Sequence, residues 1–395
     1  MTQTLALLLD AYRELSAKKL FWLVLMLSGL VVGVFALLGI TPEGVQLAIW
    51  NIGDFGGFVN SDNIPPAMFY KAMFSGLGIK FWLTWIASIL ALVSTASLIP
   101  DFIAGGAIEL SLSKPISRLR LFLTKYFSGL LFVALQVTIF SAASFLVIGL
   151  RGGEWLPGVF LAIPVVVVFF SYLYSFCALV GLVTRSTIAA LLLTLLFWVF
   201  LFCLNITDQT LIQGRELNAM RTEAIARQIE RMEKSADDQL RRELVTEKVS
   251  MGEPREQAEA EAREAAFTSE QRDQTNPKIA DAREDLTKAR DNAPAWARAA
   301  TGARIAKTFF PKTTETTDLL ERVLVEDMNL DNAEEEQDNN VPSWMRLSRA
   351  DQQKLAQRIQ AEFRQRSVWW VLGTSLGFEA LVLGVASWVF VRRDF

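Results

Sequence analysis

The chain has no histidine among its 395 residues and only two cysteines, Cys177 and Cys203. The absence of histidine excludes Ser-His-Asp catalysis, histidine acid–base chemistry and histidine-ligated metal sites. Both cysteines lie within apolar runs, so the sequence predicts neither a thiolate zinc site nor a disulfide framework. The net charge of −3 gives no basic field that would attract nucleic acid. We therefore expect no metal site and no nucleic-acid partner.

Charge is also missing from long stretches of the sequence. Hydrophobic residues make up 52% of the chain and charged residues only 21%. A membrane-spanning helix needs about 20 mostly apolar residues. The first five segments that meet this requirement contain no charged residue, and the sixth contains only Glu379. The sequence therefore predicts an all-α integral membrane protein with six transmembrane helices. These are Leu20–Ile40, Phe81–Ile99, Phe127–Gly149, Val159–Val183, Thr187–Leu204 and Trp369–Val391.

The distribution of Lys and Arg predicts the orientation of these helices. The side that carries more Lys and Arg in its short loops is normally cytoplasmic, whereas long domains translocate largely regardless of their charge. We therefore expect a multi-pass protein of the plasma (inner) membrane, with both termini cytoplasmic and residues 205–366 extracytoplasmic. The cytoplasmic side carries Arg13, Lys18, Lys19, Lys114, Arg118, Arg120, Lys125, Arg185, Arg392 and Arg393, and the other side carries Lys71, Lys80 and Arg151.

This pattern divides the chain into four parts. Residues 1–19 form an amphipathic helix that we expect to lie in the cytoplasmic interface, the alternative being a cytosolic extension of the first span. Residues 20–204 hold the first five transmembrane helices, with a cytoplasmic loop at 100–126. Residues 205–366 form a large helical insertion between the fifth and sixth helices. Residues 367–395 hold the sixth helix and a cytoplasmic tail.

The insertion has the periodicity of long helices. Apolar residues recur every three or four positions from Leu217 to Leu244, which predicts an amphipathic helix. Gly252 and Pro254 interrupt this pattern, and further helical stripes follow. The stripes are narrow and rich in Ala, which suits a coiled-coil stalk or hairpin. Because the composition is rich in Glu, Arg, Gln and Ala, disorder within 213–300 is the alternative.

The cytoplasmic loop is the most informative segment of the sequence. Pro100 ends or kinks the preceding span, and Asp101 can cap a new helix. Residues 102–112 supply apolar surface, and Lys114-Pro115 forces a turn. A short helix with an apolar face, set across the cytoplasmic mouth of a helix bundle, offers a docking partner a surface to hold. An ordinary amphipathic linker is the alternative.

Residues 106–118 read Gly-Ala-Ile-Glu-Leu-Ser-Leu-Ser-Lys-Pro-Ile-Ser-Arg. This run resembles the corresponding loop of type-2 ABC exporter permeases, the membrane-spanning subunits of ABC transporters of the six-helix export type. That family also has a cytoplasmic N-terminal helix and a last span that ends in a basic pair, similar to Arg392-Arg393 here. The resemblance covers residues 1–204 and about 305–395, whereas 213–300 looks like an insertion.

The resemblance implies a function and a set of partners. A separate cytoplasmic ATP-binding subunit would hold ATP and Mg and receive the loop in a groove, and the loop would couple ATP hydrolysis to substrate movement. A second permease subunit, identical or different, would complete the transport path, and the added outer helices could contact an envelope partner. This chain lacks a Walker A motif, so we expect it not to be an enzyme by itself. The contact residues that the resemblance implies are Asp101, Glu109, Ser113, Lys114, Pro115 and Arg118.

Two questions stay open from the sequence. Glu379 lies within the sixth span, where a charge usually faces a bundle interior or a cavity. It could line the translocation path, or it could bond a neighbouring helix through Ser141, Ser144 or Ser171, and we favour the bonding role. The whole chain could instead be a membrane-anchored coiled-coil scaffold of the cell envelope without transport activity.

Overall fold

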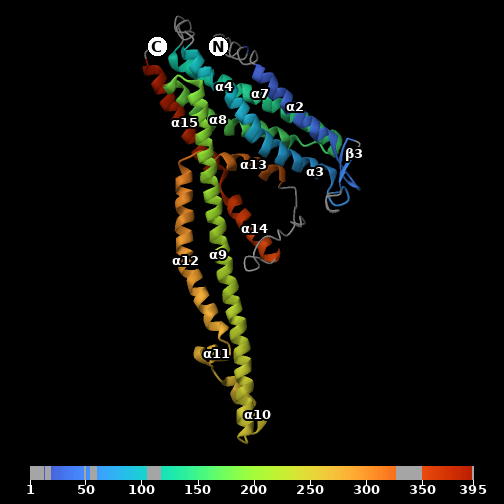
Figure 1. Ribbon diagram of the computed structural model, residues 1–395, viewed down its shortest axis with the longest axis vertical. Coiled ribbons are helices and arrows are strands. Elements are labelled where there is room, and N and C mark those ends of the chain that lie inside the picture. Colours follow the sequence, from blue (N-terminus) through green and yellow to red (C-terminus); the bar gives the residue numbers. More distant parts are fainter. Residues whose placement is uncertain are drawn as a thin grey trace. The chain divides into compact units, whose positions relative to one another are not determined.

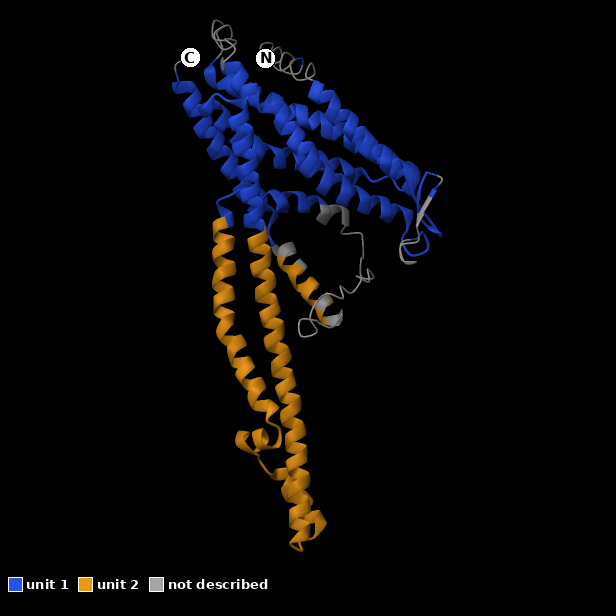
Figure 2. Cartoon of the chain, in the orientation of Figure 1, with its two compact units in different colours: residues 1–205, 307–339, 366–395 blue, residues 206–306, 340–365 orange. Residues whose placement is uncertain are grey.

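A computed structural model describes the chain at residues 13, 19–48, 50–53, 60–104, 117–325 and 349–393. Within these ranges the chain is almost entirely helical, as expected from the sequence (Figure 1). It divides into two compact units, coloured separately in Figure 2. Unit 1 comprises residues 1–205, 307–339 and 366–395, and unit 2 comprises residues 206–306 and 340–365. The interfacial helix predicted for residues 1–19 lies outside the described residues, apart from Arg13 and Lys19.

Among the described residues, six helical segments are long and apolar enough to cross a membrane. Their outer surfaces carry large apolar side chains, such as Trp22, Met26 and Leu30 at helical spacing, which are at least 60% exposed. Exposed apolar stripes of this kind suit contact with lipid. The chain is therefore a helical protein suited to a membrane. The segments are α2 (Lys19–Leu37), Pro66–Ile103, α7 (Arg118–Gly152), Pro157–Thr184, α9 (Thr187–Ser250) and α15 (Val368–Arg392).

The second segment is longer than the predicted span Phe81–Ile99. It begins with α3 (Pro66–Met73), continues as a π-helix, η1 (Phe74–Ala87), and ends with α4 (Ser88–Thr95) and α5 (Leu98–Ala104). Proline favours the first turn of a helix, where no intrahelical N–H bond is lost, so Pro65-Pro66 suits this start. Lys71 lies in α3, ten residues before the predicted span, and pairs with Glu154 at 3.0 Å.

A small sheet interrupts the otherwise helical fold where the sequence analysis assigned no strands, and its first strand includes the last three residues of the predicted span Leu20–Ile40. Strands β1 (Leu38–Thr41), β2 (Gly44–Leu47) and β3 (Trp50–Gly53) form an antiparallel meander in the order β1-β2-β3. Gly44 has φ of 117°, a conformation that side chains other than glycine rarely adopt, and it follows the turn between β1 and β2. The all-α prediction is therefore wrong for this short segment.

Helix α8 (Ala162–Thr184) forms the centre of unit 1, preceded by a short 3-10 turn, η2 (Pro157–Leu161). It packs against α5, α7, α13 (Thr313–Val325) and α15. Its aromatic residues Phe169, Phe170 and Tyr172 are fully buried. A helix that carries apolar side chains on all sides suits the interior of a bundle, which agrees with the burial of α8 here.

Helix α13 belongs to unit 1, although the sequence analysis placed it in the polar domain 205–366. It packs against α8, α15, η1 and η2. Leu320 and Thr316, one turn apart, are almost completely buried. The helix is amphipathic, so its composition is polar on average while one face is suited to packing on the bundle.

Unit 2 contains the charged part of α9 and the helices α10 (Arg255–Glu264), α11 (Ser269–Thr275), α12 (Lys278–Thr308) and α14 (Arg349–Gln365). Helices α9 and α12 run side by side (Figure 1). Asn218 Nδ2 donates a 3.0 Å hydrogen bond to the carbonyl of Ala289, and the indole of Trp296 packs so closely on Gly214 that a Cβ there would lie 2.4 Å from the ring. The described part of 213–300 is therefore a packed helical hairpin.

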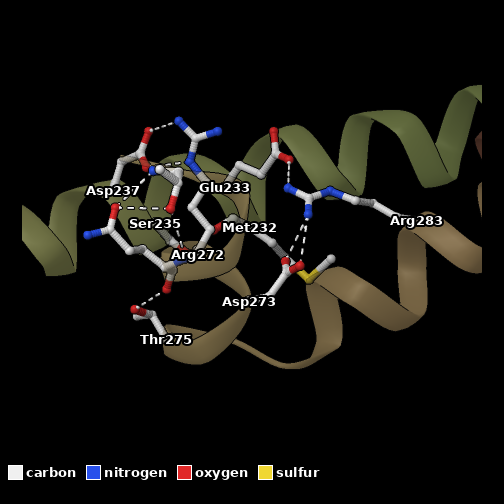
Figure 3. A network of polar contacts seen from close by, with 10 residues as sticks. Met232, Glu233, Ser235, Asp237, Arg272, Asp273, Thr275 and Arg283 are labelled. Carbon is white, nitrogen blue, oxygen red and sulfur yellow. Dashed lines mark hydrogen bonds and ion pairs between the residues drawn. The ribbon is translucent and has the colours of Figure 1, made fainter. Parts of the chain in front are cut away.

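Ion pairs fasten α11 to this hairpin (Figure 3). Arg272 binds Asp237 of α9 through two parallel hydrogen bonds, of 2.7 Å and 3.0 Å. Arg283 of α12 donates to Glu233 at 2.5 Å and to Asp273 at 2.9 Å. All five side chains are about one-fifth to one-third exposed. A network of this kind adds specific geometry to a hairpin whose apolar stripe is narrow.

Candidate functional site

The residues that the sequence analysis singled out lie in two places in unit 1. The first is the end at which α5 stops and α7 begins, which we call the loop end. Asp101 and Arg118 lie there, on the two sides of the loop. Glu109, Ser113, Lys114 and Pro115 lie outside the described residues. The second place is the interior of α15, where Glu379 lies.

The near side of the loop is built into the bundle through α5. Pro100 lies in the first turn of this helix, after a turn at residues 96–97 that follows α4, so the span bends here as the sequence predicts. Its ring packs on Gly181 of α8, where an added Cβ would lie 3.1 Å from Pro100 Cγ. Phe102 and Ile103 are buried, and Asp101 is exposed. Helix α5 therefore presents its carboxylate outward while its apolar face packs on α8.

The far side of the loop is built into the bundle through Arg118. Ser117 caps α7, its hydroxyl accepting a 3.3 Å hydrogen bond from the amide of Arg120. The guanidinium of Arg118 donates to the carbonyls of Val391 and Arg393, at 3.3 Å and 2.9 Å. Both carbonyls lie at the C-terminal end of α15, where backbone acceptors have no partner within the helix. Arg118, predicted as a partner contact, therefore bonds α15 within this chain.

A second arginine continues this connection. Arg393 donates from Nη1 to the carbonyl of Leu182, at 2.5 Å, near the C-terminal end of α8. The C-terminal ends of α8 and α15 and the start of α7 are thus linked by two arginine side chains. The sequence analysis used Arg393 only as part of a terminal basic pair. Its carbonyl contact could not be read from spacing, because the two residues are 211 positions apart.

Glu379 lies in the interior of unit 1, and its side chain is only 9% exposed. Tyr126 of α7 donates to Oε1 at 2.9 Å, and Ser171 of α8 donates to Oε2 at 2.7 Å. Ser171 is one of the three serines named from the sequence. The hydroxyls of Ser141 and Ser144 are buried without a hydrogen-bond partner in the described structure.

Both carboxylate oxygens of Glu379 thus accept hydrogen bonds from neutral hydroxyl groups on two other helices. Among the described residues, no Lys or Arg forms an ion pair with this carboxylate. Tyr126 also stacks on Tyr174, with ring centroids 5.1 Å apart. This arrangement links α7, α8 and α15 at one point. Tyr126 was missed in the sequence because a tyrosine at the start of an apolar run has no distinguishing pattern.

The described residues hold no group of three or more Asp, Glu, Cys or His side chains that could bind a metal ion. Cys177 is buried and Cys203 is exposed, and the two do not form a disulfide with each other. The interactions shown at the loop end and around Glu379 are hydrogen bonds and packing between helices.

The comparisons with known proteins give one match. The sequence profile of a family described as a protein of unknown function, DUF2705, matches residues 39–216, which is less than half of the chain. This range extends from β1 to the middle of α9 and includes the loop and Tyr126, but not Glu379. No curated protein and no solved structure matches the chain. The family description assigns no activity.

Proposed function

We propose that this chain is the transmembrane permease subunit of an ATP-driven ABC exporter. A separate cytoplasmic ATP-binding subunit would hold ATP and Mg and would dock on the loop between α5 and α7. The chain would contribute its loop and its six apolar helices, and a second permease subunit would complete the transport path. On this proposal the loop end is cytoplasmic, and the membrane is the plasma (inner) membrane.

The observation that carries the proposal is the way the loop is attached. Its sequence resembles the coupling loop of type-2 ABC permeases, and both of its flanks are fixed to central helices. Helix α5 packs on α8 at Gly181, and Arg118 binds the end of α15. These are the two helices that meet again at Ser171 and Glu379. A displacement of the loop would therefore act on both helices together, which is what coupling to an ATPase requires.

Glu379 has a positioning role in this proposal. Its oxygens are both used within the bundle, so it holds α7, α8 and α15 together and contributes no free carboxylate to a passing substrate. A translocation path lined by this residue is the less supported alternative.

A second candidate is a membrane-anchored scaffold of the cell envelope without transport activity. The packed hairpin of unit 2, with its network of ion pairs, favours this alternative. A scaffold would need the six apolar helices only as an anchor, and its loop between α5 and α7 would have no coupling role. The two candidates therefore differ in their response to changes in the loop.

The test compares two charge deletions of the same residue types. One variant carries Glu109→Ala and Lys114→Ala in the loop. The control carries Glu284→Ala and Lys288→Ala, an exposed pair 2.7 Å apart on α12. Each tagged full-length chain is purified from native membranes, and the co-purified protein and its ATPase activity are measured. We expect the wild-type and control chains to retain an ATPase that the loop variant loses. An ATPase that is absent from all three preparations, with envelope proteins bound instead, would favour the scaffold.

A further inference from the structure

A buried ionic cluster lies in unit 1 at the end away from the loop, where α13 packs against η2. Glu315 of α13 pairs with Lys307 and with Arg366, and the three side chains are only 4–6% exposed. Arg366 Nη1 lies 2.8 Å from Glu315 Oε1. Lys307 Nζ also donates to Asn205 Oδ1, at 2.6 Å. Charges this deeply buried are maintained only when they are paired and hydrogen-bonded.

Three of the four residues stand where the chain passes between the two units. Asn205 is the last residue of unit 1 before its first departure into unit 2. Lys307 is the first residue after the chain returns, and Arg366 is the first after its second return. The remaining passage, at 339/340, lies outside the described residues. Three of the four points at which the chain passes between the units are thus connected, within unit 1, by the carboxylate of Glu315 and the amide of Asn205.

Other contacts reinforce the same three segments. Lys312, which precedes α13, donates its amide to Ser375 Oγ at 2.9 Å, and its ammonium lies 4.3 Å from the ring centroid of Trp370. Phe310 packs against Phe200 of α9 and Phe378 of α15, with centroids 5.2 Å and 6.4 Å apart. The residues around Phe310 and Lys312 therefore bridge α9 and α15, and the ionic cluster lies next to this bridge in sequence.

The pairing is asymmetric at the carboxylate. Lys307 and Arg366 both bind Oε1 of Glu315, whereas Oε2 is buried and has no hydrogen-bond partner in the part of the chain that the structure describes. Because both cations bind the same carboxylate, any change that removes its charge or displaces the Glu315 side chain weakens both pairs at once.

We infer that Glu315, with Asn205, Lys307 and Arg366, forms a clasp that holds three ends of unit 1 together. Because one carboxylate binds both cations, the segment around Lys307 and the segment around Arg366 open together, as one cooperative unit. This inference is independent of the exporter proposal, because it concerns the helix ends of unit 1 and not the loop.

The test measures amide hydrogen exchange in the full-length chain, purified in detergent, by mass spectrometry. Glu315→Gln keeps the shape of the side chain and removes its charge. We expect exchange to accelerate by about tenfold in both segments, residues 304–312 and 366–371, because both cations lose the same buried carboxylate together. Glu284→Gln, which removes an exposed partner of Lys288, is the matched control and should leave both segments unchanged.

Two outcomes would overturn the inference. Acceleration in only one of the two segments would show that the pairs open independently, and no acceleration in either would show that Glu315 does not hold them. If the Glu315→Gln chain does not fold, Glu315→Asp provides the same comparison. It keeps the charge on a side chain one methylene shorter, which we expect to weaken both pairs, so exchange in the two segments should again rise together.

Discussion

The carboxylate of Glu379 illustrates how single residues decide the packing of this bundle. Its two oxygens are bonded by hydroxyl groups from two different helices, so the charge in the sixth span is accommodated without a cation among the described residues. The sequence analysis identified the residue and one of its partners. It could not choose among three serines, because α8 and the other helices are apolar on all sides and give no helical face to align.

Tyr126→Phe tests this contact. The variant keeps the ring that stacks on Tyr174 and removes the donor to Oε1, which leaves a buried acceptor unsatisfied. We expect the free energy of unfolding to fall by about 1–3 kcal/mol, measured by thermal unfolding in detergent. Tyr70→Phe, which removes a 2.6 Å bond to the neutral carbonyl of Leu38, is the control and should cost less. Equal losses in the two variants would contradict a special role for the carboxylate.

Lys312 gives a prediction on pH dependence. Burial lowers the pKa of Lys312 from 10.5 to about 8; Lys307 and Arg366 also lower it, and Glu315 raises it. Between about pH 8 and pH 10.5 the unfolded chain therefore binds more protons at this residue than the folded chain does. Over this window the Lys312 contribution to the free energy of unfolding rises with pH. Below about pH 8 the lysine is charged in both states, and the cost of burying the charge is fully present.

The measurement compares melting temperatures of the wild type and Lys312→Met from pH 7.5 to pH 10. The melting temperature of the wild type should rise relative to that of Lys312→Met as the pH rises, because only the wild type is stabilised by deprotonation at this position. Lys288→Met, at an exposed residue, should run parallel to the wild type. A Lys312→Met curve that is also parallel to the wild type would contradict the prediction.

At the scale of elements, the attachment of α11 depends on a few charged side chains. Arg283 binds Glu233 of α9 and Asp273 of α11, so Arg283→Gln removes two ion pairs at once. We expect a loss of about 1 kcal/mol and faster proteolysis between residues 264 and 277, because partly buried networks contribute more than single exposed pairs. Arg255→Gln removes an exposed pair with Glu259 and should have little effect on cleavage. Equal cleavage rates would argue against the network.

The individual helices and strands also show how much of the fold could be predicted from the sequence. Each of the six predicted spans overlaps an apolar helical segment of the described chain, because long apolar runs are uncommon outside membranes, and the helical periodicity after Leu217 is present in α9. The start of the second segment at Pro66 was missed because Lys71 and Lys80 were assigned to a loop, whereas both lie within the helical segment. The sheet at 38–53 was missed because its strands are only four residues long.

The candidate site was less predictable than the helices. Asp101 and Arg118 were named from the loop motif, but the bonds from Arg118 to the end of α15 join residues more than 270 positions apart. The Glu315 clasp likewise joins segments separated by 51 and 102 positions. Local periodicity carries no information about such pairs, which depend on how the helices pack.

At the scale of the whole chain, the two units have different physical character. Unit 1 contains apolar helices whose outer faces suit lipid, and unit 2 contains charged helices held by ion pairs and a narrow buried stripe of Ala, Ile and Met residues. The exporter proposal assigns the coupling function to the loop end of unit 1. It leaves unit 2 available for contact with an envelope partner, which the scaffold alternative would make its principal role.

The most direct test of the exporter proposal is site-specific photo-crosslinking from the loop in native membranes. A photoreactive amino acid replaces Glu109, and the crosslinked product is identified by mass spectrometry. The same replacement at Glu284, on the exposed surface of α12, is the control. The proposal predicts that position 109, and not position 284, captures a protein with a Walker A motif. Capture of lipid alone, or of a protein without an ATP-binding motif, at position 109 would contradict it.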